Sequence, residues 1–484
     1  MYSRLLIASA LSAGLVAGVN ASDWSKDPDV AVDPSHIVAS ILQLDPPIET
    51  AAESLDTILG TGGEPVGMDE AAVPASSSSW GALFVDDDHA QCPNAMFTSI
   101  QAAINASGPN ATIKVCPGTY AEQVRIDGHL HDGLKLESLK SWQATIKWPV
   151  IETPPLALVS IHSATRVTVR DFTISGPFTF AGCSPDRHEG VLVDNAFDAW
   201  ILHNHITTIQ NSNPLLFGCQ EGDAVSIGRR TLVPSAGSAR VEHNAIDEYQ
   251  KNGVQVVNRS SARVTHNVIT GSTNLAVQAI IASNGVVVFG EAAATVDHNV
   301  ISNNNFTPFP LSTGIILDES PLNSSRVDHN LLFDNDFGIE TDTQVGLEIS
   351  HNDLFNHRGD AIMLCGDVTQ GCGPAMNIKV MNNNITANAG SGITLLAADA
   401  NLLRGNYVNG NGTAVPLPDQ TDGIRLDANS ANNRLSENRA SDNVTHDCHD
   451  DSIGTAGTAG TENFWINNKG NTENRPGLCK PDQW

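Results

Sequence analysis

Basic residues are scarce in this sequence. Its 484 residues contain 26 Lys and Arg against 54 Asp and Glu, which gives a formal net charge of −28 at pH 7. Because binding to phosphate groups requires clustered Lys and Arg, this balance argues against nucleic acid as a partner. It also argues against a bare polyanion, since an acidic protein that handles pectate or alginate needs a bridging cation or a local basic patch. A neutral glycan needs neither.

Long hydrophobic runs are also missing. Beyond the N-terminus no segment reaches 18 consecutive apolar residues, so no membrane span is predicted. The apolar run at residues 5–19 is too short to cross a bilayer, follows Arg4 and leads to the small residue Ala21. This is the pattern of a secretory signal peptide over residues 1–21. We therefore expect an exported, extracellular protein with no membrane span.

Residues 22–79 lack basic residues almost completely. They are rich in Pro and Ser and contain eleven Asp or Glu against Lys26 alone. We interpret this segment as an acidic linker or propeptide. The folded part then extends over residues 80–484 as one domain, including a cap at its C-terminal end, and a monomer is expected.

One short phrase, roughly V-x-H-N-x-I, recurs between about Val191 and Asn438. Its Asn residues are separated by 22 or 23 residues, with about nine more in the longer turns. Such a period indicates a solenoid. The six strong copies lie at His203-Asn204, His243-Asn244, His266-Asn267, His298-Asn299, His329-Asn330 and His351-Asn352. Weaker copies end the series at Asn383, Asn406 and Asn438.

A second phrase, roughly G-I-x-L, alternates with the first. Its opening small residues are Gly190, Ala224, Gly253, Gly285, Gly314, Gly338, Ala361, Gly392 and Gly423. Each repeat therefore holds three short runs with alternating apolar residues, which is the period of a half-buried strand. This predicts an all-β fold, a single-stranded right-handed parallel β-helix with three short strands per coil. The helical spacing of "FTSIQAAI" at residues 97–104 predicts a short N-terminal capping helix.

These motifs together resemble a known family. The segment "FTSIQAAI…IKVCPGTYAEQVRI", followed by the V-x-H-N-x-I and G-I-x-L units, is similar to the opening and body of secreted pectin-lyase-like β-helix repeat proteins over residues 80–484. The resemblance implies an extracellular, glycan-associated β-helix. The polygalacturonase-like N-T-D and G-H-G motifs are absent, so the resemblance leaves the activity open.

The chain has eight cysteines but no C-x-x-C or Cys/His zinc spacing. An even count behind a signal peptide indicates disulfides. Because a solenoid keeps sequence neighbours close in space, we expect the pairs Cys92–Cys116, Cys183–Cys219, Cys365–Cys372 and Cys448–Cys479. Nine N-x-S/T sequons would be glycosylation sites in a eukaryotic secretory pathway, and they lie at Asn20, Asn105, Asn110, Asn258, Asn305, Asn323, Asn384, Asn411 and Asn443.

Equivalent residues of stacked coils form columns about 4.8 Å apart. The Asn column is expected at a turn, where its amides bond to one another and to the backbone as a structural ladder. The His column is expected on the same strand face as the inward Val, as a packed stack of rings. A metal role for it is disfavoured, because a tetrahedral site needs ligands that converge on one point.

Acidic residues gather on the outward face of the G-I-x-L strand. Asp318 and Asp342 occupy equivalent positions, with Glu319 and Glu340 beside them, and Asp360 lies on the next coil. Neighbouring coils would hold these carboxylates roughly 5 to 8 Å apart, the range of acid/base pairs in glycoside hydrolysis. Close like charges also raise one pKa, which keeps one carboxyl protonated.

We therefore predict a working centre of Asp318, Glu340 and Asp342. Asp360 is its supporting residue, and Arg358, which enters the same coil after His357, is a charge partner. The turns at residues 210–222 and 365–372 are expected to form the walls of a groove along this face, suited to a linear chain.

Other interpretations of the same residues remain open. The acidic residues could form a solvated face, or they could bind Ca²⁺, although no EF-hand is present and no cofactor is assigned. One functional hypothesis is a secreted polysaccharide lyase or glycoside hydrolase. The alternative is a non-catalytic glycan-binding or cell-surface structural protein, which would use the groove without an acid/base pair. In either case the expected partner is a polysaccharide or cell-surface glycan.

Overall fold

The computed structural model describes residues 81–229, 235–320, 324–413 and 421–481. The predicted signal peptide at 1–21 and the acidic linker at 22–79 lie outside the described residues, as do the sequons at Asn20 and Asn323. Within these ranges no helix combines the length and apolar character that a membrane crossing requires.

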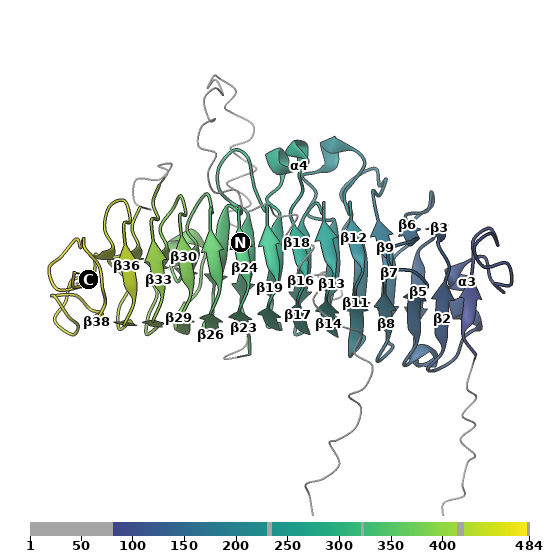
Figure 1. Cartoon of the computed structure of the whole chain (residues 1–484), viewed down its shortest axis with the longest axis horizontal. Helices are drawn as coiled ribbons and strands as arrows, with labels where there is room; N and C mark the ends of the chain where they lie inside the picture. The colour runs from purple at the N-terminus through teal and green to yellow at the C-terminus, as the bar shows by residue number, and fades with distance from the viewer. Residues whose placement is uncertain (1–80, 230–234, 321–323, 414–420, 482–484) are drawn as a thin grey trace, which may run out of the picture. The chain divides into compact units, whose positions relative to one another are not determined.

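Three parallel sheets run along the stack of coils, and each complete coil contributes one strand to each sheet, while β1 and β38 extend only sheet A at its two ends (Figure 1). Sheet A contains β1 (Leu83–Val85), β2 (Thr112–Val115), β5 (Lys135–Ser138), β8 (Thr168–Arg170), β11 (Ala199–Leu202), β14 (Ser238–Glu242), β17 (Ser261–Thr265), β20 (Ala293–Asp297), β23 (Arg326–Asp328), β26 (Val345–Ser350), β29 (Met376–Met381), β32 (Leu402–Arg404), β35 (Arg434–Ser436) and β38 (Phe464–Ile466).

Sheet B contains β3 (Gly118–Ala121), β6 (Ala144–Lys147), β9 (Thr173–Ser175), β12 (His205–Thr207), β15 (Ala245–Asp247), β18 (Val268–Thr270), β21 (Val300–Ser302), β24 (Leu331–Phe333), β27 (Asp353–Phe355), β30 (Asn384–Thr386), β33 (Tyr407–Asn409) and β36 (Arg439–Ser441). Sheet C contains β4 (Val124–Asp127), β7 (Ala157–His162), β10 (Glu189–Asp194), β13 (Asp223–Ile227), β16 (Asn252–Val257), β19 (Asn284–Phe289), β22 (Thr313–Asp318), β25 (Phe337–Asp342), β28 (Ile362–Cys365), β31 (Ile393–Leu396), β34 (Ile424–Leu426) and β37 (Cys448–Asp450).

The core is a set of aliphatic columns inside the coils. In one coil Ile315 on β22, Val327 on β23 and Leu332 on β24 are fully buried. Their equivalents one coil later are directly paired with them, for example Val327 with Ile349. The sequence alternation therefore places one apolar column from each sheet in the interior. The predicted right-handed parallel β-helix is confirmed.

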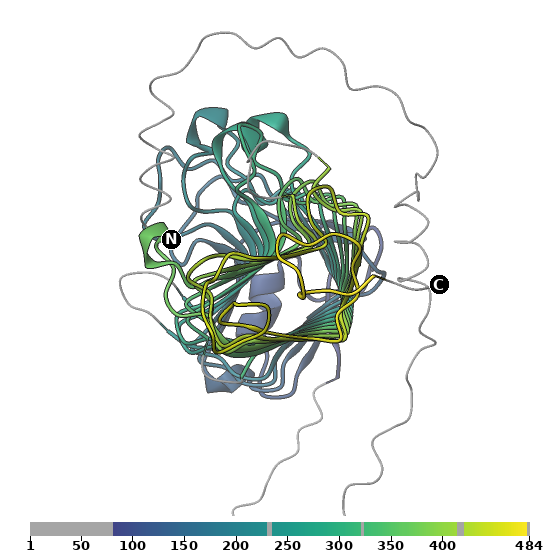
Figure 2. The ribbon, with the colours of Figure 1, turned by 90° about the vertical axis from the view of Figure 1, so that its left-hand side faces the viewer.

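The first coil is closed by the predicted capping helix, α3 (Ile100–Ala106). Its N-cap Ser99 accepts a hydrogen bond from the backbone N–H of Ala102, and Glu122 accepts bonds from the backbone N–H groups of Ile100 and Gln101. Its apolar side, which includes Ile104, is buried over the end of the core (Figure 2). The helix thereby covers apolar surface that the first coil would otherwise expose.

The remaining helical segments lie in turns. Among the described residues the 3₁₀ segments are η1 (His129–His131), η2 (Pro214–Leu216) and η3 (Val368–Gln370), and α4 (Leu275–Ile280) is a further α-helix. The longer turns thus accommodate their extra residues partly as single helical turns.

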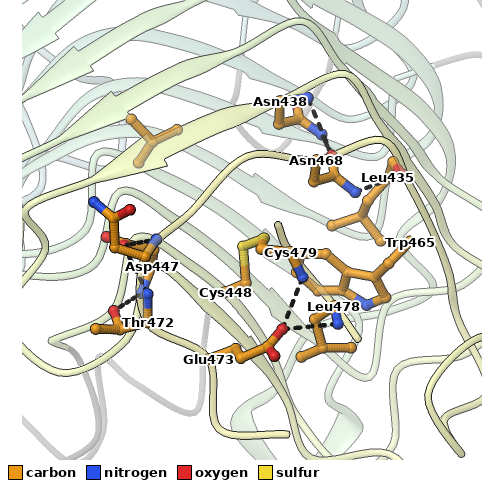
Figure 3. The surroundings of a disulfide bond; sticks show 12 residues. Leu435, Asn438, Asp447, Cys448, Trp465, Asn468, Thr472, Glu473, Leu478 and Cys479 are labelled. Carbon is orange, nitrogen blue, oxygen red and sulfur yellow. Dashed lines mark hydrogen bonds between the residues drawn. A yellow bond between two sulfur atoms is a disulfide. The ribbon is translucent and has the colours of Figure 1, made fainter. Parts of the chain in front are cut away.

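All four predicted disulfides are present, with the predicted partners. The last one, Cys448–Cys479, ties strand β37 to the C-terminal segment (Figure 3). Glu473 supports this link because Oε2 accepts hydrogen bonds from the backbone N–H groups of Leu478 and Cys479, both at 2.9 Å. Together with buried Trp465 these contacts close the C-terminal end of the core.

The predicted Asn ladder is confirmed. In each coil the Asn Nδ2 donates to Oδ1 of the next Asn at 2.9–3.2 Å, and its backbone N–H donates to the same oxygen in the copies from Asn204 onward. The ladder continues past Asn438 to Asn468, one coil further than the sequence phrase indicated. Asn411 and Asn443 belong to a similar ladder at the turn between sheets B and C and are buried. In the folded chain the side-chain amides of these two sequons are therefore covered.

The His column is stacked as predicted, but its predicted position on the inward face is wrong. The six rings follow one another with centroids 4.8–5.0 Å apart. However, each His has a positive φ of 53–57°, and about half of the side chains of His298, His329 and His351 is exposed. The left-handed backbone interrupts the strand alternation and directs the rings outward.

Candidate functional site

The outer face of sheet C carries the columns in which the sequence placed the candidate residues. Glu340 pairs in register with Ile316 on β22 and with Met363 on β28, and Asp318 pairs with Asp342. Asp318 and Glu340 are nevertheless only 6% and 5% exposed. The candidate carboxylates therefore lie in a largely water-excluded setting.

Asp318 and Asp342 form the central pair of this face. Burial, followed by the nearby charges of Asp342 and Glu319, raises the pKa of Asp318 to about 7. Asp342 lies under the small disulfide loop, because its Oδ1 is 3.3 Å from the Sγ of Cys372. One carboxyl of the pair can thus hold a proton at neutral pH while its neighbour is more exposed.

Glu340 lies two positions before Asp342 on β25, whereas Asp360 is level with Phe337, five positions before Asp342, so the predicted supporting role of Asp360 in this pair is wrong. Glu340 accepts a hydrogen bond from the hydroxyl of Thr313 at 3.1 Å. Asp360 is fully buried just before β28, and its Oδ1 accepts a bond from the backbone N–H of Ser391 at 2.7 Å. Burial raises the pKa of Asp360 to about 6.

Arg358 is bound elsewhere. Its Nη1 donates to Oδ1 of Asp336 at 2.8 Å and to the backbone oxygen of Phe306 at 3.2 Å. Asp336 also accepts bonds from the backbone of Leu311 and Ser312, so the pair fastens the long turn that precedes β22. The structure thus gives Arg358 a carboxylate partner in a turn.

His357, the neighbour of Arg358, takes an Asn position in the ladder between sheets B and C. Its ring Nδ1 accepts a hydrogen bond from the backbone N–H of Asn335 at 3.3 Å. The backbone N–H of His357 donates to Oδ1 of Asn388. Burial lowers the pKa of His357 to about 3, so the imidazole is neutral. Its contacts are those of a ladder member.

The Ca²⁺ interpretation gains no support from the geometry. Within the described ranges, Asp318 and Glu340 belong to no group of three converging His, Cys, Asp or Glu ligand atoms. Asp342 does converge with Cys365 and Cys372, but these sulfurs form a disulfide. Disulfide sulfur is not a ligand for a hard cation that prefers oxygen.

A second carboxylate pair, which sequence reasoning did not single out, lies on the same face toward the N-terminus. Glu189 on β10 pairs in register with Asp223 on β13. Burial and the charge of Asp223 raise the pKa of Glu189 to about 8. Asp223 is fully buried and accepts bonds from Asn252 at 2.7 Å and Gln255 at 2.9 Å. The sequence does contain a sign of this pair: Glu189 and Asp223 each stand directly before the small residue that opens a G-I-x-L unit, in two consecutive repeats.

His188, next to Glu189, forms a buried triad with two glutamates. Its Nδ1 is 2.7 Å from Glu221 and its Nε2 is 3.0 Å from Glu152. The ring stacks on Phe178 with 4.0 Å between centroids. Although burial opposes the charged form, the two glutamates raise the pKa of His188. The partners come from irregular turns 33 and 36 residues away, so no repeat pattern revealed them.

The long turns next to sheet C pack on one another. Phe217, in the turn at residues 210–222, contacts Val277 and Ile281 around α4 in a small apolar cluster. At their tips Leu215 and Leu275 are 89% and 73% exposed. Helix α4 stands out beyond the stacked coils (Figure 1). The predicted turn thus forms a folded projection with apolar tips.

Comparisons with known proteins agree with the fold. Residues 190–370 match the family model described as a right handed beta helix region. No curated protein sequence matches the chain. A similar solved structure is the A-module of the mannuronan C-5 epimerase AlgE6 from Azotobacter vinelandii, with 16% identity, a TM-score of 0.46 and coverage of 79% of this chain and 95% of that one.

Two further solved structures are similar. The complex of XylC with xylose has 11% identity, a TM-score of 0.47 and coverage of 74% of this chain and 86% of that one. The periplasmic alginate epimerase AlgG has 13% identity, a TM-score of 0.41 and coverage of 74% and 77%. With TM-scores below 0.5, these three structures support no further argument. The family model and the three parallel sheets confirm the resemblance to right-handed β-helix proteins at the level of the fold.

Proposed function

We propose that this protein is an exported carbohydrate-active enzyme, a glycoside hydrolase or polysaccharide lyase, that binds a glycan along the outer face of sheet C. The proposal is carried by one observation: Asp318 and Asp342 are register partners on β22 and β25, and the pKa of Asp318 is raised to about 7. Export is supported by the four disulfides, since such bonds persist in oxidising compartments.

The spacing of the pair suits glycoside hydrolysis with retention. Register partners on neighbouring parallel strands lie about 4.8 Å apart, close to the roughly 5 to 5.5 Å between the two carboxyl groups of retaining enzymes. Asp318 would donate its proton to the leaving oxygen, because a pKa near neutrality is best suited to a general acid. Asp342, the more exposed partner, would act as the nucleophile, and Glu319 would add to the local negative charge that keeps Asp318 protonated.

The central pair is a better candidate than Glu189 and Asp223. Both pairs contain one carboxyl with a raised pKa. Asp223, however, is fully buried and already bonded to Asn252 and Gln255, whereas Asp342 retains exposed surface. A group that attacks a polymer must be reachable from solvent.

The test is a screen of the secreted protein against neutral and acidic polysaccharides, with detection of both new reducing ends and unsaturated products. Asp342→Asn is expected to abolish turnover, and Asp318→Asn to lower it by about 100-fold or more, as expected for loss of a general acid. Asp353→Asn, an exposed carboxylate of β27 on sheet B, is the matched control and should retain full activity. Equal activity of the parent and Asp342→Asn would refute the assignment.

A second candidate function is glycan binding without catalysis. It is favoured by the low exposure of Asp318 and Glu340 together with the exposed apolar tips at Leu215 and Leu275. This candidate predicts glycan binding with no products, and binding that is unchanged in Asp342→Asn but weakened in Leu215→Ser. The product assay and a binding assay on the same variants distinguish the two functions.

A further inference from the structure

We propose that Asp422, His446 and His449 form a binding site for a divalent transition-metal ion such as Zn²⁺ at the C-terminal end of sheet C. The proposal is independent of the carboxylate pair on β22 and β25. It concerns residues three strands further along the same sheet, where β34 and β37 pair.

The ligand atoms converge on one carboxylate. Nδ1 of His446 lies 3.0 Å from Oδ1 of Asp422, and Nδ1 of His449 lies 2.9 Å from Oδ2. The three ligand atoms all lie within 4.8 Å of one another. The two rings are nearly perpendicular, at 85°, so their nitrogens approach the carboxylate from different directions. A small ion placed between them could contact all three groups.

The site also has the outer support that metal-binding histidines usually have. The second nitrogen of His449, Nε2, lies 2.8 Å from Oδ1 of Asp451. A carboxylate in this position fixes the tautomer and orientation of the ring and leaves Nδ1 available for the metal. The backbone N–H of His446 donates to Asp422 Oδ1 at 3.1 Å, which fixes the carboxylate as well.

The surrounding backbone is held firmly. His449 pairs in register with Arg425 on β34, and the neighbouring Cys448 is bonded to Cys479. Asp447, between the two histidine positions, accepts bonds from the backbone N–H groups of Asn471 and Thr472 (Figure 3). The side chains of His446 and His449 are still 27% and 16% exposed, so an ion can enter from solvent.

The donor set indicates the class of metal. Two imidazoles and one carboxylate suit Zn²⁺ and its transition-metal neighbours, whereas Ca²⁺ and Mg²⁺ prefer oxygen ligands alone. Three protein ligands leave a fourth position for water or another molecule. The competing charge is Arg425, whose Nε is 3.9 Å from Asp422 Oδ2. Arg425 therefore competes with a metal ion for Asp422.

The His column offers the natural control. Asp328, His329 and His351 also bring ligand atoms within 4.8 Å of one another. Their Nδ1 atoms also face one carboxylate, at 2.6 and 3.1 Å from Asp328, but the rings are stacked with planes 15° apart and the two side chains are 49% and 43% exposed, so this group is less enclosed than the Asp422 site. Weak surface binding of metal to the column must be separated from binding at Asp422.

The experiment uses the full secreted chain after removal of metal by a chelator. Zn²⁺ is titrated calorimetrically near neutral pH, and Co²⁺ is added in parallel, since its visible absorption reports tetrahedral coordination. We expect one tight site in the parent and in the control His329→Gln/His351→Gln. The double variant His446→Gln/His449→Gln should lose both the tight site and the absorption band.

A third variant tests the outer support. Asp451→Asn keeps the three ligands and should weaken Zn²⁺ binding by about 10- to 100-fold. Each variant is checked for an unchanged circular dichroism spectrum without metal, so that misfolding is not mistaken for ligand loss. The proposal is overturned if His446→Gln/His449→Gln binds Zn²⁺ like the parent, or if only the column variant loses the tight site.

Discussion

Asn330 donates a hydrogen bond from Nδ2 to Oδ1 of Asn352, its equivalent one coil later, at 3.0 Å. The backbone N–H of Asn330 donates to the same oxygen at 2.9 Å, and Nδ2 also donates to the backbone oxygen of Val296 at 2.8 Å. Each amide therefore satisfies backbone groups of its own turn and of its neighbours. The ladder replaces the hydrogen bonds that the strand ladders lose where the chain bends.

We expect Asn330→Ala to destabilise the protein by about 1 to 3 kcal/mol, because it leaves buried backbone groups unpaired. Unfolding in denaturant, followed by circular dichroism, measures the loss. Asn384→Ala is the control, since the side chain of Asn384 is exposed on β30 and donates to Asp353, and the change should alter stability by less than about 0.5 kcal/mol. Equal losses in the two variants would count against the ladder.

The charge of Asp328, which accepts hydrogen bonds from the His column, is expected to make the unfolding free energy depend on pH. Although burial opposes its charge, hydrogen bonds from Ser350, His329 and His351 hold the pKa of Asp328 below its usual range. A lowered folded-state pKa stabilises the fold above the unfolded value of about 3.9, and this stabilisation disappears as the pH falls through the folded value. Asp328→Asn should therefore lower the unfolding free energy near pH 6 by roughly 1 to 3 kcal/mol.

The same comparison at low pH is the critical measurement. Below about pH 3 the difference between the parent and Asp328→Asn should shrink, since protonation of the parent removes the same charge. Asp353→Asn on the exposed strand position of β27 serves as the control. A difference that stays constant from pH 6 down to about pH 2 would show that the charge of Asp328 is not the cause.

The residues that could be predicted from the sequence are those whose position repeats. Asn330 recurs at one place in every coil, so stacking alone brings its copies together. The register of Asp318 with Asp342 followed in the same way, and the disulfide partners followed from closeness along the chain. In a solenoid these sequence relations are spatial relations.

The remaining features depend on backbone conformation or on irregular turns. The outward direction of His329 follows from a positive φ, which the alternation of apolar and polar residues does not reveal. The pairing of Arg358 with Asp336 and the triad of His188 depend on turns that differ from coil to coil. The burial of Glu340 likewise depends on packing outside the repeat. The repeat spacing therefore predicted the column in which Glu340 lies, but not that its side chain is buried.

The disulfides are expected to secure turns and caps, while the β-helix itself persists without them. Cys365–Cys372 closes a sequence separation of 7 and Cys448–Cys479 one of 31. Chain entropy then predicts losses of roughly 2.5 and 3.5 kcal/mol for the respective paired Cys→Ser variants. Both variants should retain the strand signal in circular dichroism. Loss of this signal in either one would contradict the expectation.

The last prediction concerns Asp318, whose pKa is raised to about 7 by burial and by Asp342 and Glu319. Between about pH 4 and pH 7 the folded state then binds more protons than the unfolded state, so the unfolding free energy falls as the pH rises. Above pH 7 the ionised carboxylate is a net destabilising group in the fold. Asp318→Asn stays neutral and should be more stable than the parent at about pH 8, by on the order of 4 kcal/mol.

At about pH 4 the two proteins should be nearly equally stable, because the parent carboxyl is then protonated in the folded state. Thermal and denaturant unfolding at both pH values measure this, with Asp353→Asn as the exposed control. If Asp318→Asn gains stability at pH 8 but loses turnover, the carboxyl group of Asp318 lowers the stability of the fold and is needed for the reaction. A variant that is less stable than the parent at pH 8 would mean that Asp318 is ionised and stabilised in the fold, which would remove the basis for its role as the acid.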